Sequence, residues 1–343
     1  MRIRKIIIND VNKNKNKYFF SLYTKIYVYY SFHYETNNTF SMGIQHSFSD
    51  VAIKNFRLRH TLTKHTNNIH CLLLMKDGRI ASASDDISFK IYSTFLDYSH
   101  IMTIADFSNS VSSLCQLDNE QTVAGSFDNS IRVFEIAALT YKCVSIVRNA
   151  HSEWITKVIA LPNNKVASCS LDKTIKIWQF GDSFKHCPIK VIKSEDNIIS
   201  MKYINNTIIY GNKECVTFWS TTTQQCVTKF KVSCLGSNSI YYSELLYVSG
   251  NNRISIINVN TCTIDTINIE KNDRILCLVK KGNKLICGSH NGFIYIIDIN
   301  TKTYDTIGKV HSYAINDLLL IDNNTLLSCS ADSTIKVWEQ IDN

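Results

Sequence analysis

Short runs of alternating apolar and polar residues recur along most of the chain, and turn-forming residues separate them. In the run TIKIW at residues 174–178, a period of two places both isoleucines on one face of a strand and the lysine on the other. Residues 70–75 and 79–84 are two β-rich runs joined at Lys76-Asp77-Gly78, a typical hairpin signal. The pattern predicts a protein built from β-strands.

The same turn position is occupied further along the chain by pairs rich in asparagine. These pairs are Asp118-Asn119, Asn163-Asn164, Asn205-Asn206, Gly282-Asn283 and Asn323-Asn324. Asparagine tolerates a positive φ better than other non-glycine residues. It therefore takes the place of glycine and proline in a chain that has only 11 Gly and 2 Pro.

Three segments align without gaps and share one spacing. In each, a histidine precedes an aspartate by 21 residues, and a large aromatic residue follows the aspartate by six. The sets are His65, Asp86 and Tyr92; His151, Asp172 and Trp178; and His311, Asp332 and Trp338. Weaker copies close at Phe134, Trp219, Ile257 and Ile297, so that seven closing residues follow one another at intervals of 38–44 residues. A regular period of this length predicts a repeat architecture.

These motifs resemble the WD-repeat (WD40) family of β-propellers over residues 55–343. Four strands in a unit of about 40–45 residues correspond to one propeller blade. The resemblance implies an all-β fold, a seven-bladed propeller of four-stranded antiparallel blades that occupies residues 42–343. The Trp-Asp dipeptide of the family is absent, because Gln follows Trp178 and Glu follows Trp338.

The two ends of the repeat region predict how the ring closes. The last repeat ends five residues after Trp338 and lacks an outer strand of its own, whereas a strand-like run at residues 55–62 precedes the first repeat. The family closes its ring with such an N-terminal strand. We therefore expect this run to complete the last blade and to cover its open edge.

Residues 1–41 differ from the rest of the chain. They contain seven Lys or Arg and two Asp or Glu, which leaves 30 basic and 27 acidic residues in the nearly neutral remainder. Lys25 interrupts the Tyr-rich apolar stretch at 18–34, and no small-residue cleavage site follows, so a membrane-spanning or secretory segment is not favoured. We expect either a poorly ordered extension or a gene-model artefact whose natural start is Met42.

The chain has 12 cysteines, and no two of them have Cys-x-x-Cys spacing. The absence of this spacing excludes the usual zinc-ribbon, zinc-finger and thioredoxin-like signatures. Cys169 and Cys329 occupy the same position in their repeats, and Cys71, Cys115 and Cys277 fall in first strands. We interpret them as reduced, buried residues of a cytoplasmic or nuclear protein, and we expect no cofactor and no metal.

Serine, histidine and aspartate together could suggest a hydrolase, but a nucleophile is needed once, and this set occurs three times. In WD-repeat proteins the histidine, a strand serine, the turn aspartate and the tryptophan form a buried hydrogen-bond chain. The resemblance implies such structural tetrads, and Tyr92 would supply the donor in the first. They are His65, Ser84, Asp86 and Tyr92; His151, Ser168 or Ser170, Asp172 and Trp178; and His311, Ser328 or Ser330, Asp332 and Trp338.

The resemblance also implies where partners bind. The commonest contact surface of the family is the top face, which is formed by the loops between blades and by the residues before each turn aspartate. The matching positions are Asp85, Phe127, Leu171 and Ala331 before the aspartates, and His70, Trp154 and Tyr313 after the histidines. Trp154 and Phe127 lie outside the tetrad pattern. They are either exposed binding anchors or packing residues between blades, and the sequence leaves both possibilities open.

The leading hypothesis is a non-catalytic scaffold that binds proteins or peptides through its top face, as a monomer within a larger complex. The alternative is a substrate-recognition subunit of a ubiquitin ligase or of another enzyme complex, although the Trp-Asp-x-Arg run of many ligase receptors is absent. A propeller-based hydrolase is disfavoured because no unrepeated cluster of acids or metal ligands is present. A nucleic-acid partner is disfavoured by the nearly neutral body, and a membrane partner is not expected.

Overall fold

A computed structural model describes residues 56–341, except residues 96, 181–186, 237, 239, 243, 244, 270 and 271. The secondary structure of these residues consists of 28 β-strands without an α-helix, so this part of the chain holds no helix that could cross a bilayer. The contacts divide the chain into two units, and the one considered below comprises residues 48–75 and 79–343. The expected extension at residues 1–41 lies outside the described residues.

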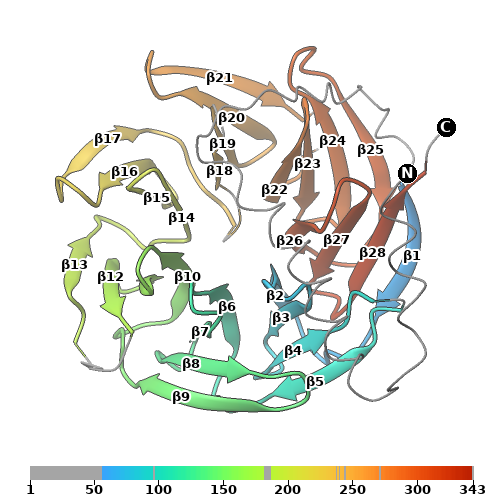
Figure 1. Ribbon diagram of the computed structural model, residues 1–343. Helices are drawn as coiled ribbons and strands as arrows, with labels where there is room; N and C mark the ends of the chain where they lie inside the picture. Colours follow the sequence, from blue (N-terminus) through green and yellow to red (C-terminus); the bar gives the residue numbers. More distant parts are fainter. Residues whose placement is uncertain are drawn as a thin grey trace, which may run out of the picture. The chain divides into compact units, whose positions relative to one another are not determined.

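Seven four-stranded antiparallel sheets form a β-propeller, as the repeat period predicts (Figure 1). Blades 1–3 contain β2 (Ile69–Leu74), β3 (Ile80–Ser84), β4 (Phe89–Tyr92) and β5 (His100–Ile104); β6 (Val111–Gln116), β7 (Thr122–Ser126), β8 (Ile131–Ile136) and β9 (Tyr141–Val147); and β10 (Ile155–Leu161), β11 (Lys165–Ser170), β12 (Thr174–Gln179) and β13 (Lys190–Lys193). Blades 4 and 5 contain β14 (Ser200–Ile204), β15 (Thr207–Gly211), β16 (Val216–Ser220) and β17 (Cys226–Phe230); and β18 (Ile240–Tyr242), β19 (Leu246–Ser249), β20 (Arg253–Asn258) and β21 (Thr263–Asn268). Blades 6 and 7 contain β22 (Ile275–Lys281), β23 (Lys284–Ser289), β24 (Phe293–Asp298) and β25 (Tyr304–Lys309); and β26 (Ile315–Leu320), β27 (Thr325–Ser330), β28 (Ile335–Gln340) and β1 (Phe56–Leu62).

The N-terminal strand closes the ring, and this prediction is confirmed. Strand β1 pairs antiparallel with β28, with Phe56 opposite Gln340 and Leu62 opposite Ile335. The two chain ends of the described region therefore lie in the same blade (Figure 1). This pairing covers an edge of β28 that would otherwise expose unpaired backbone groups.

Asparagine forms the tight turns between first and second strands in blades 3 and 4. Asn163, Asn164, Asn205 and Asn206 all have a positive φ, between 47° and 62°. Such turns match the twist of the strands that they join, and among non-glycine residues asparagine adopts them most readily.

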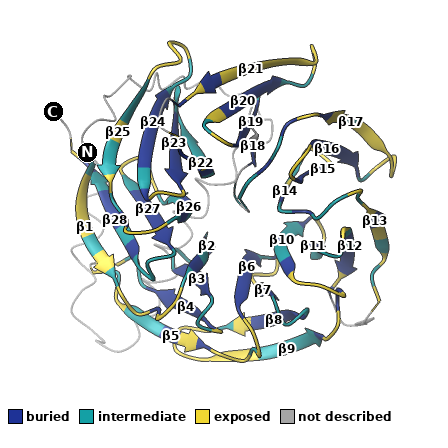
Figure 2. Ribbon diagram, turned by 180° about the vertical axis from the view of Figure 1, so that it is seen from behind, coloured by how far each residue is buried: buried dark blue, intermediate teal, exposed yellow. Residues whose placement is uncertain are grey.

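The core is divided into seven apolar clusters, and each takes residues from two neighbouring blades. Between blades 1 and 2, for example, the rings of Phe89 and Phe134 lie edge to face with their centroids 5.3 Å apart. Burial is concentrated on the inner strands, whereas the outer strands β13, β17 and β21 are largely exposed (Figure 2). The blades are thus held together by their faces rather than by a single central core.

In five blades one position of the second strand holds a small residue: Ala83, Gly125, Cys169, Gly288 and Cys329. Blades 4 and 5 have Tyr210 and Val248 there. A Cβ on Gly125 would lie only 2.8 Å from Val158 Cγ1 of the next blade. Burial raises the pKa of the free Cys169 thiol to about 12, so this cysteine is an unreactive packing residue.

Candidate functional site

In blade 3, four side chains form a chain of hydrogen bonds from the tryptophan to the turn aspartate. Trp178 Nε1 donates to Ser168 Oγ at 2.8 Å, Ser168 Oγ lies 2.7 Å from His151 Nε2, and His151 Nδ1 lies 2.8 Å from Asp172 Oδ2. Because an ionised aspartate can only accept, the proton of a neutral His151 lies on Nδ1, and Nε2 accepts the proton of the Ser168 hydroxyl, whose oxygen accepts the indole N–H. Blade 7 repeats this geometry with Trp338, Ser328, His311 and Asp332 at 2.9, 2.8 and 2.8 Å.

The electrostatics of this chain favour a neutral histidine beside an ionised aspartate. Burial lowers the pKa of His151, and the hydrogen bond with Asp172 offsets only part of this effect. Burial alone would raise the pKa of Asp172, but hydrogen bonds from His151 and Thr174 outweigh it and hold that pKa well below its usual range. His311 and Asp332 shift in the same directions.

The two serines of each repeat have different roles. In blade 3, Ser168 belongs to the chain, whereas Ser170 accepts the backbone N–H of Asp172 at 3.0 Å and so holds the turn. In blade 1 the chain serine is Ser82, whose Oγ lies 2.7 Å from His65 Nε2. The assignment of Ser84 to this tetrad is therefore wrong. Ser84 lies at the end of β3, next to the turn, where its hydroxyl accepts the N–H of Asp86 at 3.1 Å. In blade 7 the turn serine is likewise Ser330.

Blade 1 also lacks the expected donor at the end of the chain. The Tyr92 hydroxyl is buried and makes no hydrogen bond of good geometry among the described residues, although it lies near Ser82. A phenol carries its O–H at the tip of the ring, whereas an indole carries its N–H at the side. The substitution therefore preserves the apolar packing of the tryptophan but not its hydrogen bond.

Blade 2 replaces the polar chain as a unit. Phe107, Ala124 and Phe134 stand at the positions of the histidine, serine and tryptophan, and the two phenylalanine rings pack with centroids 5.9 Å apart. The turn aspartate remains: Asp128 Oδ2 lies 2.9 Å from Arg132 Nη2, and the Arg132 guanidinium lies 4.5 Å from the centroid of the Phe107 ring. The arginine thus neutralises the aspartate that lacks a histidine.

Above the tetrads, one backbone hydrogen bond recurs and places two side chains of each blade on the top face. The residue before the turn aspartate donates its N–H to the carbonyl three residues after the histidine position. These bonds join Asp85 to Asn68 (2.8 Å), Phe127 to Ser110 (2.9 Å), Leu171 to Trp154 (3.1 Å) and Ala331 to Ala314 (2.9 Å). The backbone is constant whereas the side chains differ from blade to blade, so these positions are free to carry binding specificity.

Four of the predicted contact residues form one continuous set across blades 1–3, which we call the top-face cluster. The rings of Trp154 and Phe127 are stacked, with centroids 4.6 Å apart and planes inclined by 15°. Phe127 also contacts the ring of His70 at 5.5 Å, and His70 Nε2 lies 2.5 Å from Asp85 Oδ1. Trp154 remains 46% exposed, so it is not buried between blades.

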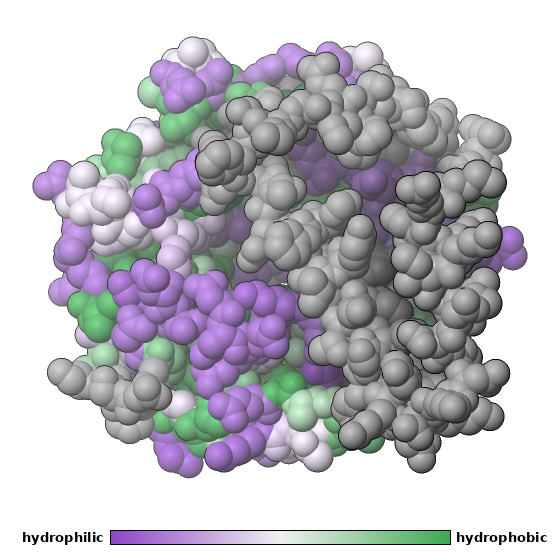
Figure 3. All heavy atoms as spheres, viewed as in Figure 1, coloured by the Kyte–Doolittle hydropathy of each residue, from purple (hydrophilic) through white to green (hydrophobic). Residues whose placement is uncertain are grey.

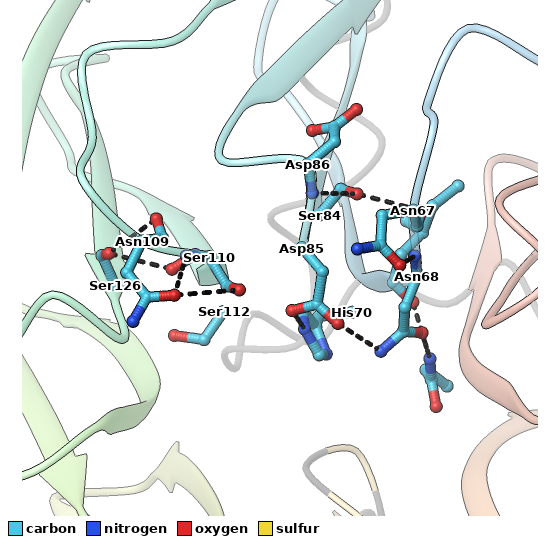
Figure 4. Close-up of polar contacts among 12 residues, drawn as sticks. Asn67, Asn68, His70, Ser84, Asp85, Asp86, Asn109, Ser110, Ser112 and Ser126 are labelled. Carbon is cyan, nitrogen blue, oxygen red and sulfur yellow. Dashed lines mark hydrogen bonds and ion pairs between the residues drawn. The ribbon is translucent and has the colours of Figure 1, made fainter.

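Two asparagines that sequence reasoning missed position Asp85. Asn68 Nδ2 donates to Asp85 Oδ2 at 3.0 Å (Figure 4). Asn316 Nδ2 donates to Asn68 Oδ1 at 2.6 Å and so links blade 7 to blade 1. Burial alone would raise the pKa of Asp85, but hydrogen bonds from His70 and its other neighbours lower it. The signal for these asparagines was their position, three and five residues after the repeat histidines.

His70 departs from the role that its position has in other blades. There, the corresponding side chain donates to a backbone carbonyl of the next blade. The bonds are Ser112 to Ile155 (2.5 Å), Thr156 to Ile198 (2.7 Å) and Asn316 to Ile69 (2.7 Å). His70 instead bonds Asp85 on its own blade. The His70 side chain therefore contributes a hydrogen bond on the top face rather than one between neighbouring blades.

The remaining predicted contact residues lie apart from the top-face cluster or contribute only backbone. Leu171 is half-buried and bonds the Trp154 carbonyl through its N–H. Tyr313 and Ala331 lie on blade 7, where Tyr313 is 66% exposed. No hydrogen bond or ring contact of the described residues joins Tyr313 to the cluster. Figure 3 shows one face of the molecule, on whose described part hydrophilic residues gather in a patch with smaller apolar areas around it.

The closed ring of four-stranded blades and the repeated tetrads define a β-propeller built from sequence repeats. Four segments, residues 56–93, 99–135, 141–179 and 303–339, match the family model "WD40: WD domain, G-beta repeat". The chain therefore contains WD40 repeats and folds as a seven-bladed β-propeller.

A similarity to a characterised protein accompanies this match. Over 246 residues the chain is 23% identical to the E3 ubiquitin-protein ligase COP1 of Pisum sativum. The aligned region covers 66% of this chain but only 36% of that relative.

In the described part of the chain, no group of three or more His, Cys, Asp or Glu side chains is arranged to hold a metal ion.

Proposed function

We propose that this chain is a non-catalytic interaction module that binds a peptide segment of a partner protein at the top-face cluster, as a monomer within a multiprotein complex. The observation that carries the proposal is the exposed Trp154 stacked on Phe127. Large aromatic residues that are fixed by packing yet open to solvent lose little entropy on binding, and they dominate the energy of many interfaces.

The burial of the tetrads supports a non-catalytic role. His65, His151 and His311 are only 4%, 1% and 2% exposed. A substrate carbonyl cannot approach a serine whose hydroxyl lies between a buried histidine and a buried indole. The repeated Ser–His–Asp sets therefore hold turns in place.

The test is selection from a phage-displayed peptide library on the wild-type chain. The enriched peptides are then titrated by fluorescence anisotropy against wild type and Trp154→Ala. We expect Trp154→Ala to weaken binding by about 2 kcal/mol or more. The control is Leu139→Ala, which removes another exposed apolar side chain, 80% exposed, from the β8–β9 turn at the opposite end of blade 2. Circular dichroism checks folding. Equal affinities for wild type and Trp154→Ala would contradict the proposal.

A second candidate is a substrate-recognition subunit of a ubiquitin ligase, and the similarity to COP1 favours it. The top-face cluster would then bind the substrate. Affinity purification from the native cell, followed by mass spectrometry, should recover ubiquitin-ligase subunits with both wild type and Trp154→Ala, and substrates with wild type alone. Recovery of a complex without ligase subunits would contradict this candidate and leave the interaction module intact.

A further inference from the structure

We infer that the top-face cluster recognises a basic side chain, an arginine or a lysine of the bound peptide. This inference rests on the proposed function and specifies the chemistry of its ligand. It follows from the exposed indole of Trp154 and from two acidic residues on the same face, Glu153 and Asp85.

The stacked pair leaves an aromatic surface available. Phe127 lies nearly parallel to Trp154 and covers one side of the indole, while the Trp154 side chain remains 46% exposed. The face of an aromatic ring carries negative electrostatic potential, and indole attracts cations most strongly among the aromatic side chains. A guanidinium can also stack flat on this surface.

Two acidic residues accompany the aromatic pair on the top face. Glu153 directly precedes Trp154 and is exposed. Asp85, at the other end of the cluster, is held by His70 and Asn68, and its side chain is 25% exposed. Because these hydrogen bonds fix Asp85 in advance, a cation that approaches it meets a preorganised acceptor.

These two carboxylates differ from the aspartates beneath them. Asp128 is paired with Arg132 at 2.9 Å, and Asp86 lies 3.7 Å from Lys90 Nζ. No lysine or arginine in the described ranges pairs with Asp85 or Glu153. An acidic ligand would be repelled by these carboxylates, and a purely apolar one would remove water from Glu153 without compensation. A basic side chain can stack on the indole, and Glu153 next to it in sequence, or Asp85 further along the cluster, supplies the opposite charge.

The test uses the peptides selected on the wild-type chain, with each arginine replaced by citrulline, a neutral side chain of the same shape. We expect citrulline to weaken binding about tenfold or more, because both the cation–π attraction and the charge pairing are lost. Asp85→Asn and Glu153→Gln should each weaken the arginine peptide but leave the citrulline peptide unchanged. The matched control is Glu120→Gln, an exposed acid in the β6–β7 turn at the opposite end of blade 2.

The outcomes separate this inference from the proposed function. Peptides that require Trp154 but lack a basic residue, or that bind equally with citrulline, would overturn the inference and leave the interaction module standing. If binding needs neither Trp154 nor the basic residue, both are wrong. Loss of binding to Trp154→Ala together with loss on citrulline replacement supports both.

Discussion

Blades 2 and 3 have the same strand order and the same turn aspartate, but they stabilise that aspartate in opposite ways. Blade 3 uses the buried chain of Trp178, Ser168 and His151. Blade 2 uses two packed phenylalanines and an ion pair between Asp128 and Arg132. Both aspartates also accept hydrogen bonds from a backbone N–H and a hydroxyl two residues later, Ser130 in blade 2 and Thr174 in blade 3.

Blade 2 has replaced the histidine, the serine and the tryptophan together, whereas blade 1 keeps His65 and Ser82 beside Tyr92 and blade 4 keeps only Trp219. A buried polar chain stabilises only while each member has a partner, and a partly satisfied chain is worse than an apolar core. We therefore expect that replacement of one member of a complete tetrad costs more free energy of unfolding than replacement of the whole set, as in blade 2. The predictions below test this rule, in order of decreasing effect.

The largest effect is expected in blade 2. Asp128→Ala leaves the guanidinium of Arg132, which is only 8% exposed, without its carboxylate. Removal of one partner of a buried ion pair should cost about 3 kcal/mol in the free energy of unfolding, measured by urea denaturation. The double variant Asp128→Ala with Arg132→Met should recover part of the loss, because the hydrogen bonds from Ser108 and Ser130 to Asp128 stay absent. No recovery would show that the ion pair is not what the turn depends on.

In blade 3, Asp172→Ala should cost about 1–3 kcal/mol, because it leaves the buried His151 Nδ1–H without an acceptor and loosens the turn. The same denaturation measurement applies, and Glu153→Gln on the exposed loop nearby provides the unaffected control. A loss below experimental error would contradict the structural role of the tetrad.

A smaller change in the free energy of unfolding is expected when the complete set of blade 2 residues replaces the tetrad of blade 3. His151→Phe alone should cost about 2 kcal/mol, because Ser168 and Asp172 lose their shared partner. The combination His151→Phe, Ser168→Ala, Lys176→Arg and Trp178→Phe should lie within about 1 kcal/mol of wild type, because transfer of the complete set leaves no buried group unpaired. Additive losses in the combined variant would refute replacement as a unit.

The smallest effect concerns pH. Burial lowers the pKa of His65, His151 and His311 below the ordinary value of 6.5. The unfolded chain then binds more protons than the folded chain, so the stability is present above about pH 6.5 and is lost as the pH falls. Unfolding free energies at pH 7.5, 6.0 and 5.0 should decline for wild type, and the four-residue variant, with one buried histidine fewer, should decline less. Parallel slopes would contradict this assignment.

The sequence by itself determined the repeat period, the strands and the hairpin turns, because strand alternation and turn chemistry are local properties. Closure of the ring by the run at 55–62 was implied by the resemblance to the WD-repeat family. The positions of His151, Asp172 and Trp178 were also readable, because their spacing recurs in blade 7.

Only the tertiary structure decided how these residues meet. Ser82 and Ser84 lie on the same strand two residues apart, and only the position of His65 decides which of them joins the chain. The sequence contains Phe107 and Arg132 without showing that the two touch. The top-face cluster likewise joins residues of three blades that are far apart in sequence, from Asp85 to Trp154. Such contacts depend on how neighbouring blades are rotated and spaced, and a pattern confined to one repeat carries no information about that geometry.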